Sequence, residues 1–186
     1  MNYTIDSIKN WLKENLTEER YEHSLGTAEC AEKLAEKYGL DSKKAYFTGL
    51  IHDCAKCMPK DEMLRMLKTL PLQEGELCNS KTHHAPVGAY VARQNFGVND
   101  EEILSAIRWH TIGKVNMTLF EKIIFLADKM EERTRPQECI DLIKVLDEEN
   151  GLDKALLICY KNTIKSLIDR ELPICTSAVE IYNSLL

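Results

Sequence analysis

Helical periodicity runs through almost the whole sequence, and this feature limits the fold more than any other. Apolar residues recur every three or four positions, as they do from Ile5 to Leu16. Residues 118–121, Thr-Leu-Phe-Glu, form a capping-box pattern, Asp100 can cap a helix start, and Gly39 and Gly97 stand where helices would end. No alternating run indicates a strand, and no repeat or linker divides the chain. We therefore predict a single all-α domain over residues 1–186.

The same signals set the expected helix boundaries. Helices are predicted over 5–16, 17–38, 41–57, 60–70, 86–96, 101–109, from 118 onward, after Pro136, on either side of Gly151 and after Pro173. Residues 72–82 are polar and are predicted to form a loop. The motifs described below lie within about 17–136, and we expect the helices of 137–186 to pack on that core.

Composition excludes several classes of protein. A chain of 186 residues suits one domain with a substantial core. The net charge of −6 argues against a partner that is a nucleic acid polymer, since such binders normally carry a basic excess. No apolar stretch approaches the roughly 18 residues needed to span a membrane, and residues 1–6 lack the features of a signal peptide. We expect a cytoplasmic protein with no membrane partner. The oligomeric state is left open, a homodimer included.

The cysteines show no framework of disulfide bonds. There are seven, an odd number, without regular spacing. Together with the start of the chain, this predicts reduced thiols. Cys54 and Cys57 form a CxxC pair, but no second pair accompanies it, so packing is favoured over a zinc or redox role.

Histidine and aspartate follow a pattern typical of metal ligands. All five histidines and two aspartates fall in the order H…HD…H…H…D: His23, His52, Asp53, the pair His83 and His84, His110 and Asp128. Imidazole and carboxylate together bind first-row divalent metals, and the absence of thiolates favours iron or manganese over a structural zinc site. The pattern therefore predicts a metal-dependent hydrolase.

Three of these residues lie in apolar surroundings. His52 and Asp53 occur within a predicted apolar helix, where neighbouring side chains point about 100° apart. Asp53 has two oxygens, so it can bridge two ions. An unpartnered buried pair would be costly, which favours ligands over a polar helix face. Asp128 ends the apolar run 123–127 and needs a cation or hydrogen-bond donors, with an N-cap or a surface ion pair as the alternative.

For the remaining histidines, the neighbouring residues in sequence indicate whether the side chain faces a site. Gly26 lies one turn beyond His23 and would let another helix or an ion approach closely. His110 stands at a predicted helix end, where its ring can turn into a cleft. His84 is followed by a run of small residues that can lie close to a site, so we prefer it to His83, which is expected to be exposed.

Four cations lie near the candidate ligands in sequence. Arg20 and Lys56 are within one turn of candidate histidines, and Arg133 and Arg135 follow Asp128. Such placement suits a phosphorylated substrate, with ordinary solvated charges as the alternative. We favour Arg133 over Arg135 for the contact with substrate.

Five short segments carry a family resemblance. They are RYEHSLG at 20–26, GLIHDCAK at 49–56, HAPVGA at 84–89, HTIG at 110–113 and LADKME at 126–131. Together they resemble the YqeK family of bacterial symmetrical dinucleoside tetraphosphatases, within the HD-domain metal-dependent phosphohydrolase superfamily. The match covers roughly Arg20 to Pro136.

The resemblance implies a function and a set of roles. It implies an HD-domain helical bundle, a centre of one or two iron ions, with manganese, cobalt or zinc as alternatives, and hydrolysis of diadenosine tetraphosphate to two ADP. The implied metal ligands are His23, His52, Asp53 and Asp128, and His84 and His110 complete a second metal site or contact phosphate. Catalytic roles fall on Asp53, His84 and His110, and the substrate contacts are Arg20, His23, Asp53, Lys56, His84, His110 and Arg133. The family usually continues Glu-Pro-Gly-Arg after the aspartate, whereas residues 131–136 here are EERTRP. Arg133 and Arg135 are therefore both candidates for the family's arginine, and Arg133 is the nearer match.

Two other functions remain open. The chain could be another HD-type nucleotide phosphohydrolase or phosphodiesterase, which a substrate panel would separate. It could also be a nucleotide-sensing module without turnover, although the presence of all six candidate ligands argues against a decayed site.

Overall fold

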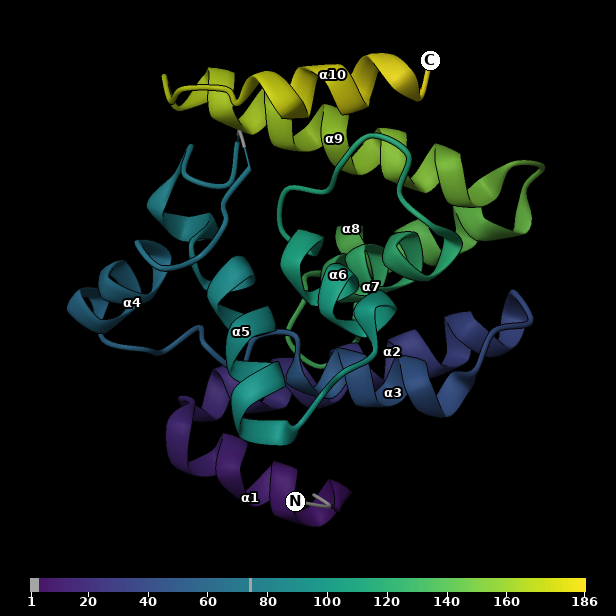
Figure 1. The fold of residues 1–186 in the computed structure, drawn as a ribbon. Coiled ribbons are helices and arrows are strands. Elements are labelled where there is room, and N and C mark those ends of the chain that lie inside the picture. The colour runs from purple at the N-terminus through teal and green to yellow at the C-terminus, as the bar shows by residue number, and fades with distance from the viewer. Residues whose placement is uncertain (1–3, 74) are drawn as a thin grey trace.

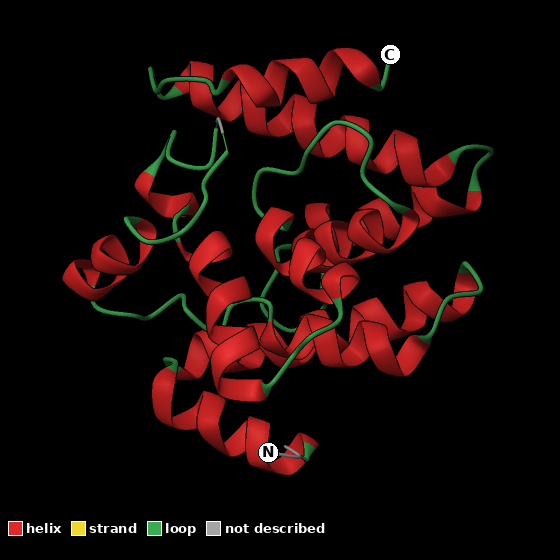
Figure 2. Ribbon diagram, in the orientation of Figure 1, coloured by secondary structure: helices red, strands yellow, loops and turns green. Residues whose placement is uncertain are grey.

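The computed structural model describes residues 4–73 and 75–186, and within these ranges the regular elements are all helices (Figures 1 and 2). The prediction of an all-α fold is confirmed. Residues 1–3, part of the start that was expected to lack a signal peptide, and Glu74 in the predicted loop lie outside the described residues. In the described chain, no helix is both long and apolar enough to cross a membrane.

The helices follow one another with short connections. The α-helices are α1 (Ile5–Asn15), α2 (Glu18–Lys37), α3 (Ser42–Ile51), α4 (Lys60–Leu67), α5 (His84–Phe96), α6 (Glu101–Trp109), α7 (Leu119–Met130), α8 (Gln137–Ile140), α9 (Gly151–Asp169) and α10 (Thr176–Ser184). Two 3₁₀ helices, η1 (Ser80–Thr82) and η2 (Asp141–Asp147), lie between them.

Several helix ends use the residues that the sequence indicated. Thr118 and Glu121 form the capping box of α7: Thr118 Oγ1 accepts from the Glu121 backbone N–H at 3.2 Å, and Glu121 Oε2 accepts from the Thr118 N–H at 2.8 Å. Asp100 caps the start of α6 through its side chain. Gly97 ends α5 with φ of 67°, in the left-handed region that favours glycine.

Two helices end three or more residues earlier than predicted. The third predicted helix was expected to reach Cys57, but α3 ends at Ile51 and residues 52–57 form consecutive turns. His52 donates from Nδ1 to the Gly49 carbonyl, so its side chain takes up an acceptor of the last turn. The helix predicted over 60–70 ends at Leu67, where the Thr69 hydroxyl donates to the Met66 carbonyl.

Helix α2 is central to the packing and lies against both α3 and α7. The approach of α3 depends on Gly49. A Cβ at this position would lie 2.8 Å from both the Thr27 carbonyl oxygen and the Ala28 Cα. Because these are backbone atoms, only glycine allows α3 to lie this close to α2. The close packing brings the end of α3 against the middle of α2.

The C-terminal helices cover the outer side of α7. Tyr160 of α9 stacks on Phe125 of α7 with ring centroids 5.5 Å apart, and α10 packs on α9 (Figure 1). These contacts belong to one of two buried apolar clusters, and the other joins α1 and α3 to α5 and α6.

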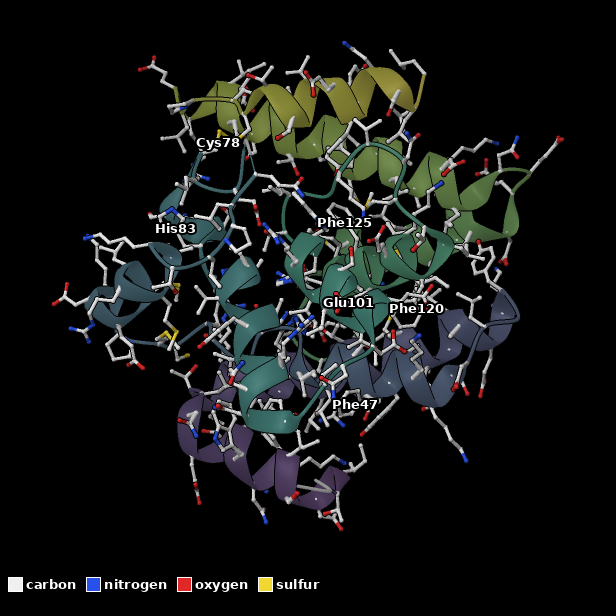
Figure 3. All side chains as sticks on the ribbon, in the orientation of Figure 1. Phe47, Cys78, His83, Glu101, Phe120 and Phe125 are labelled. Atoms are coloured by element: carbon white, nitrogen blue, oxygen red, sulfur yellow. A yellow bond between two sulfur atoms is a disulfide. The ribbon has the colours of Figure 1, made fainter. Side chains whose placement is uncertain are left out.

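The expectation that every thiol is reduced is wrong. Cys78, in the loop before α5, forms a disulfide with Cys175, just before α10 (Figure 3). The partners are 97 residues apart in sequence, so the pairing depends on how the loop and the C-terminal segment meet and could not be read from spacing. The other five cysteines are free, including Cys54 and Cys57.

Candidate metal centre

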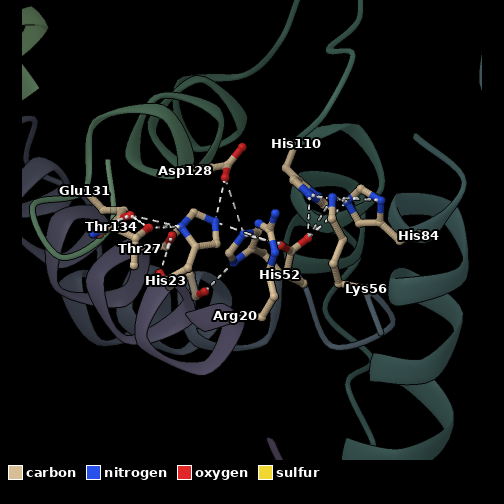
Figure 4. A network of polar contacts seen from close by, with 12 residues as sticks. Arg20, His23, Thr27, His52, Lys56, His84, His110, Asp128, Glu131 and Thr134 are labelled. Carbon is tan, nitrogen blue, oxygen red and sulfur yellow. Dashed lines mark hydrogen bonds and ion pairs between the residues drawn. The ribbon is translucent and has the colours of Figure 1, made fainter. Parts of the chain in front are cut away.

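The six candidate ligands come from five helices and the turns that follow them, and they meet in one buried cluster (Figure 4). His23 lies in the middle of α2, and His52 and Asp53 follow α3. His84 begins α5, His110 follows α6 and Asp128 lies near the end of α7. Each of the six is no more than 5% exposed. A buried cluster of this kind requires partners for its polar atoms.

Asp53 stands at the middle of the cluster. Its Oδ1 lies 3.0 Å from His84 Nε2 and 3.3 Å from His110 Nε2. Its Oδ2 lies 3.8 Å from His52 Nε2 and 3.9 Å from His23 Nε2. One carboxylate thus faces two pairs of imidazoles, an arrangement that suits a ligand shared by two ions.

Two groups of donor atoms are close enough to hold a cation, and both contain Asp53. Within each group the ligand atoms lie within 4.8 Å of one another: His23, His52 and Asp53 form the first, and Asp53, His84 and His110 form the second. Asp128 adds a further donor to the first group, since its Oδ1 lies 2.9 Å from His23 Nε2 and 3.7 Å from His52 Nε2.

Two histidines are oriented by the ends of their own helices. His52 Nδ1 lies 2.6 Å from the Gly49 carbonyl oxygen, and His110 Nδ1 lies 2.6 Å from the Ile107 carbonyl oxygen. Each histidine is the C-cap of its helix, where carbonyls of the last turn lack a helical partner. A proton on Nδ1 leaves the Nε2 lone pair directed into the cluster, as a metal ligand requires.

His52 Nε2 carries one of these lone pairs. His52 Nε2 is buried and has no hydrogen-bond partner among the described residues. An unsatisfied buried acceptor is costly, and in this position a cation shared with Asp53 and Asp128 would satisfy it. The donor set therefore fits a divalent metal.

The protonation states also suit metal ligands. Burial would raise the pKa of Asp53, but the imidazoles of His52, His110 and His84 outweigh it and hold that pKa well below its usual range. Burial lowers the pKa of His84, and it lowers the pKa of His110 to about 4 despite the nearby Asp53. At neutral pH the ionised Asp53 carboxylate therefore faces neutral imidazoles of His84 and His110.

Four partly exposed cations surround the cluster, and we call them the cation rim: Arg20, Lys56, Lys129 and Arg135. Arg20 Nη1 lies 3.6 Å from Asp53 Oδ2, and Lys56 Nζ lies 4.0 Å from Asp53 Oδ1. Arg135 Nη2 donates to Asp128 Oδ1 at 2.7 Å, and Lys129 also pairs with Asp128. Their side chains are 27–33% exposed, so they can meet a ligand from solvent. Lys129 was not predicted from the sequence, although it directly follows Asp128.

Arg133 lies away from this rim. Its guanidinium pairs with Glu22 at 2.5 Å and with Glu29 at 2.7 Å, both on the outer side of α2. Arg135 instead reaches back along α7 and also donates from Nε to the Asp128 carbonyl at 2.7 Å. The positions favour Arg135 over Arg133 for a role at the cluster, the reverse of the preference drawn from sequence.

The two neighbouring histidines differ in the way that the sequence suggested. His84 is buried against Asp53, whereas His83 makes no contact with the ligand cluster among the hydrogen bonds and ion pairs of the described residues. His83 is half-buried rather than exposed as expected.

Comparison with known proteins places these features in a family. A family model described as HD domain matches residues 20–133. The chain is 41% identical over 175 residues to a symmetrical bis(5'-nucleosyl)-tetraphosphatase of Bacillus subtilis, with 94% of this chain and 93% of the relative covered. It is 40% identical over 184 residues, at the same coverage, to a protein of the same name from Halalkalibacterium halodurans.

A solved structure agrees over the whole chain. The crystal structure of a Clostridium acetobutylicum protein, described as a predicted HD superfamily hydrolase involved in NAD metabolism, superposes with a TM-score of 0.90. It is 37% identical in sequence, and the match covers 100% of this chain and 98% of that one.

Proposed function

Because this chain belongs to the HD domain family, we propose that it is a metal-dependent phosphohydrolase that cleaves diadenosine tetraphosphate symmetrically to two ADP. The names of the two relatives, each similar over nearly the full chain, support the substrate. The observation that carries the proposal is the position of Asp53, whose Oδ1 lies near His84 and His110 and whose Oδ2 lies near His23 and His52. We treat residues 1–186 as one HD domain.

We propose His23, His52, Asp53 and Asp128 as ligands of a first metal ion, with His84 and His110 in a second site or in contact with phosphate. Iron is the expected metal, with manganese, cobalt and zinc as alternatives, because the donors are imidazole and carboxylate without thiolate. When bound, such a metal supplies Lewis-acid activation of water and of the scissile phosphate.

The cation rim suits a chain of phosphates. Arg20, Lys56, Lys129 and Arg135 are proposed to neutralise charge on the phosphate oxygens, as phosphoryl transfer requires. Arg135 takes the role that the sequence assigned to Arg133. Neutral His84 can exchange a proton at the reacting phosphate. Lys56 Nζ lies 3.1 Å from the Nε2 atom of His84.

The test is hydrolysis of diadenosine tetraphosphate in ¹⁸O-labelled water. We expect ADP alone, with one ¹⁸O in the β-phosphate of one ADP of each pair. ATP plus AMP would contradict symmetric cleavage. Nucleotide binding without cleavage by the metal-loaded protein would instead favour a sensor.

A substrate panel addresses the other enzymatic alternative. Faster cleavage of a different nucleotide would indicate another HD-type phosphohydrolase or phosphodiesterase, and NAD belongs in the panel because of the description given to the solved relative. A cytoplasmic location and a homodimer stay predictions, which fractionation and light scattering would test.

A further inference from the structure

His23 is held between two carboxylates at the end of helix α7 (Figure 4). Its Nε2 lies 2.9 Å from Asp128 Oδ1, and its Nδ1 lies 3.1 Å from Glu131 Oε1. Asp128 and Glu131 are three residues apart, so both can reach one ring on the facing helix α2. Glu131 had no role in the sequence argument.

The position of His23 explains why it needs an outside partner. His52 and His110 each use the carbonyl three residues earlier, which is free because the helix ends there. His23 lies well inside α2, which runs from Glu18 to Lys37, so the carbonyl groups around it are bonded within the helix. An acceptor for its Nδ1 proton must come from another element, and Glu131 supplies it.

The Glu131 carboxylate also organises the turn that follows α7. Its Oε2 accepts from the backbone N–H of Arg133 at 2.7 Å and of Thr134 at 3.0 Å, and the Thr134 hydroxyl donates to Oε1. Glu131 is fully buried. The turn ends at Arg135, whose guanidinium reaches Asp128, so one carboxylate orients both a ligand and a member of the cation rim.

Gly26 makes room for this carboxylate. It lies one turn beyond His23 on α2, and a Cβ there would lie 2.2 Å from Glu131 Oε2 and 3.0 Å from Glu131 Cδ. No side chain can occupy that position while Glu131 keeps its place. The sequence suggested that Gly26 admits a close neighbour, and the neighbour is Glu131.

We propose that Glu131 is a positioning residue of the metal centre. It holds the His23 ring with the Nε2 lone pair directed at the metal, and Gly26 is the residue that admits it. The inference rests on the metal centre under the proposed function, but not on the identity of the substrate.

Binding of Mn²⁺ to metal-stripped protein, measured by equilibrium dialysis, tests this. Glu131→Ala and Gly26→Ala should each weaken binding by about 10- to 100-fold, the effect typical of losing a partner of a metal-bound histidine. The double variant should bind no more weakly than Glu131→Ala alone, because the added Cβ then has no carboxylate to displace and its remaining close neighbour is the Arg133 Cβ at 3.3 Å. If each substitution only damaged the structure at its own position, the two losses in binding free energy would add in the double variant.

A matched control separates this effect from general damage. Glu132→Ala removes the neighbouring exposed carboxylate and should bind Mn²⁺ within about twofold of the wild type. If Glu131→Ala fails to fold, Glu131→Gln keeps the volume but turns an amide N–H₂ group toward backbone donors, and it should also bind more weakly.

Wild-type affinity in folded Gly26→Ala or Glu131→Gln would overturn the inference, as would additive losses in the double variant. Dialysis does not require turnover. A wild-type protein that binds Mn²⁺ but leaves diadenosine tetraphosphate intact would therefore refute the substrate and not the role of Glu131. A wild-type protein that binds no Mn²⁺ would overturn both.

Discussion

Replacement of Asp53 by asparagine tests whether one carboxylate joins the two ligand groups. Oδ1 of Asp53 lies 3.0 Å from the nearest nitrogen of His84, and Oδ2 lies 3.8 Å from that of His52. Asparagine keeps the volume, but it offers one neutral oxygen and turns an N–H₂ group toward the other side. We therefore expect Asp53→Asn to lose most of its metal affinity.

The loss can be converted into a shift in thermal stability. At a free Mn²⁺ concentration of 100 times Kd, binding at one site stabilises the folded protein by about 2.7 kcal/mol. A chain of this size gains roughly 2–4 °C in Tm for each kcal/mol, so the wild type should gain roughly 5–11 °C. A 100-fold loss of affinity leaves about 0.4 kcal/mol, a shift of less than about 2 °C.

Calorimetry of metal-stripped protein, with and without Mn²⁺, measures this directly. Each shift is referred to the metal-free Tm of the same variant, so a change in intrinsic stability does not enter. Asp61→Asn serves as the control, because Asp61 is an exposed carboxylate in the first turn of α4 and should retain the full shift. A shift of wild-type size in Asp53→Asn would refute the shared-ligand argument.

Three other results are expected. Arg135→Ala should lower kcat/KM for diadenosine tetraphosphate at least tenfold more than Arg133→Ala, because Arg135 bonds Asp128 and Arg133 instead bonds Glu22. Equal losses would argue against a role of Arg135 at the metal centre. His84→Ala should abolish turnover in steady-state assays while His83→Ala has a mild effect, and the opposite order would mean that the wrong histidine was chosen. Thiol titration of the unfolded protein should find five thiols before reduction and seven after it, and seven thiols without reductant would exclude the disulfide. Loss of the disulfide in Cys78→Ser should lower the free energy of unfolding by about 2–4 kcal/mol.

Features that depend on neighbouring residues could be predicted from the sequence. The capping box at Thr118 and the αL glycine at position 97 involve atoms within a few residues, so their local signals were sufficient. The all-α fold and the family relationship, both confirmed, follow from such signals and from short motifs. The six residues that meet in the cluster could also be chosen, because a histidine or aspartate buried in apolar surroundings is costly unless it binds a partner.

Features that depend on which atoms a side chain contacts, within one turn or between distant segments, could not be predicted from the sequence. The end of α3 was misplaced because the His52 side chain takes an acceptor from its own last turn, which periodicity does not reveal. Arg133 was preferred as the nearer match to the arginine of the family's Glu-Pro-Gly-Arg, but the turn after α7 directs it toward Glu22 and carries Arg135 back to the cluster.

Local chemistry along the chain was enough to predict which segments form helices and which residues can bind a metal. Which atoms face one another depends on how those helices pack. Glu131 became a partner of His23 because α7 lies against α2, and Gly26 leaves the space that its carboxylate fills. Cys78 met Cys175 because the loop before α5 reaches the start of α10. Contacts across 97 or more residues depend on the packing of whole helices, and no local pattern encodes them.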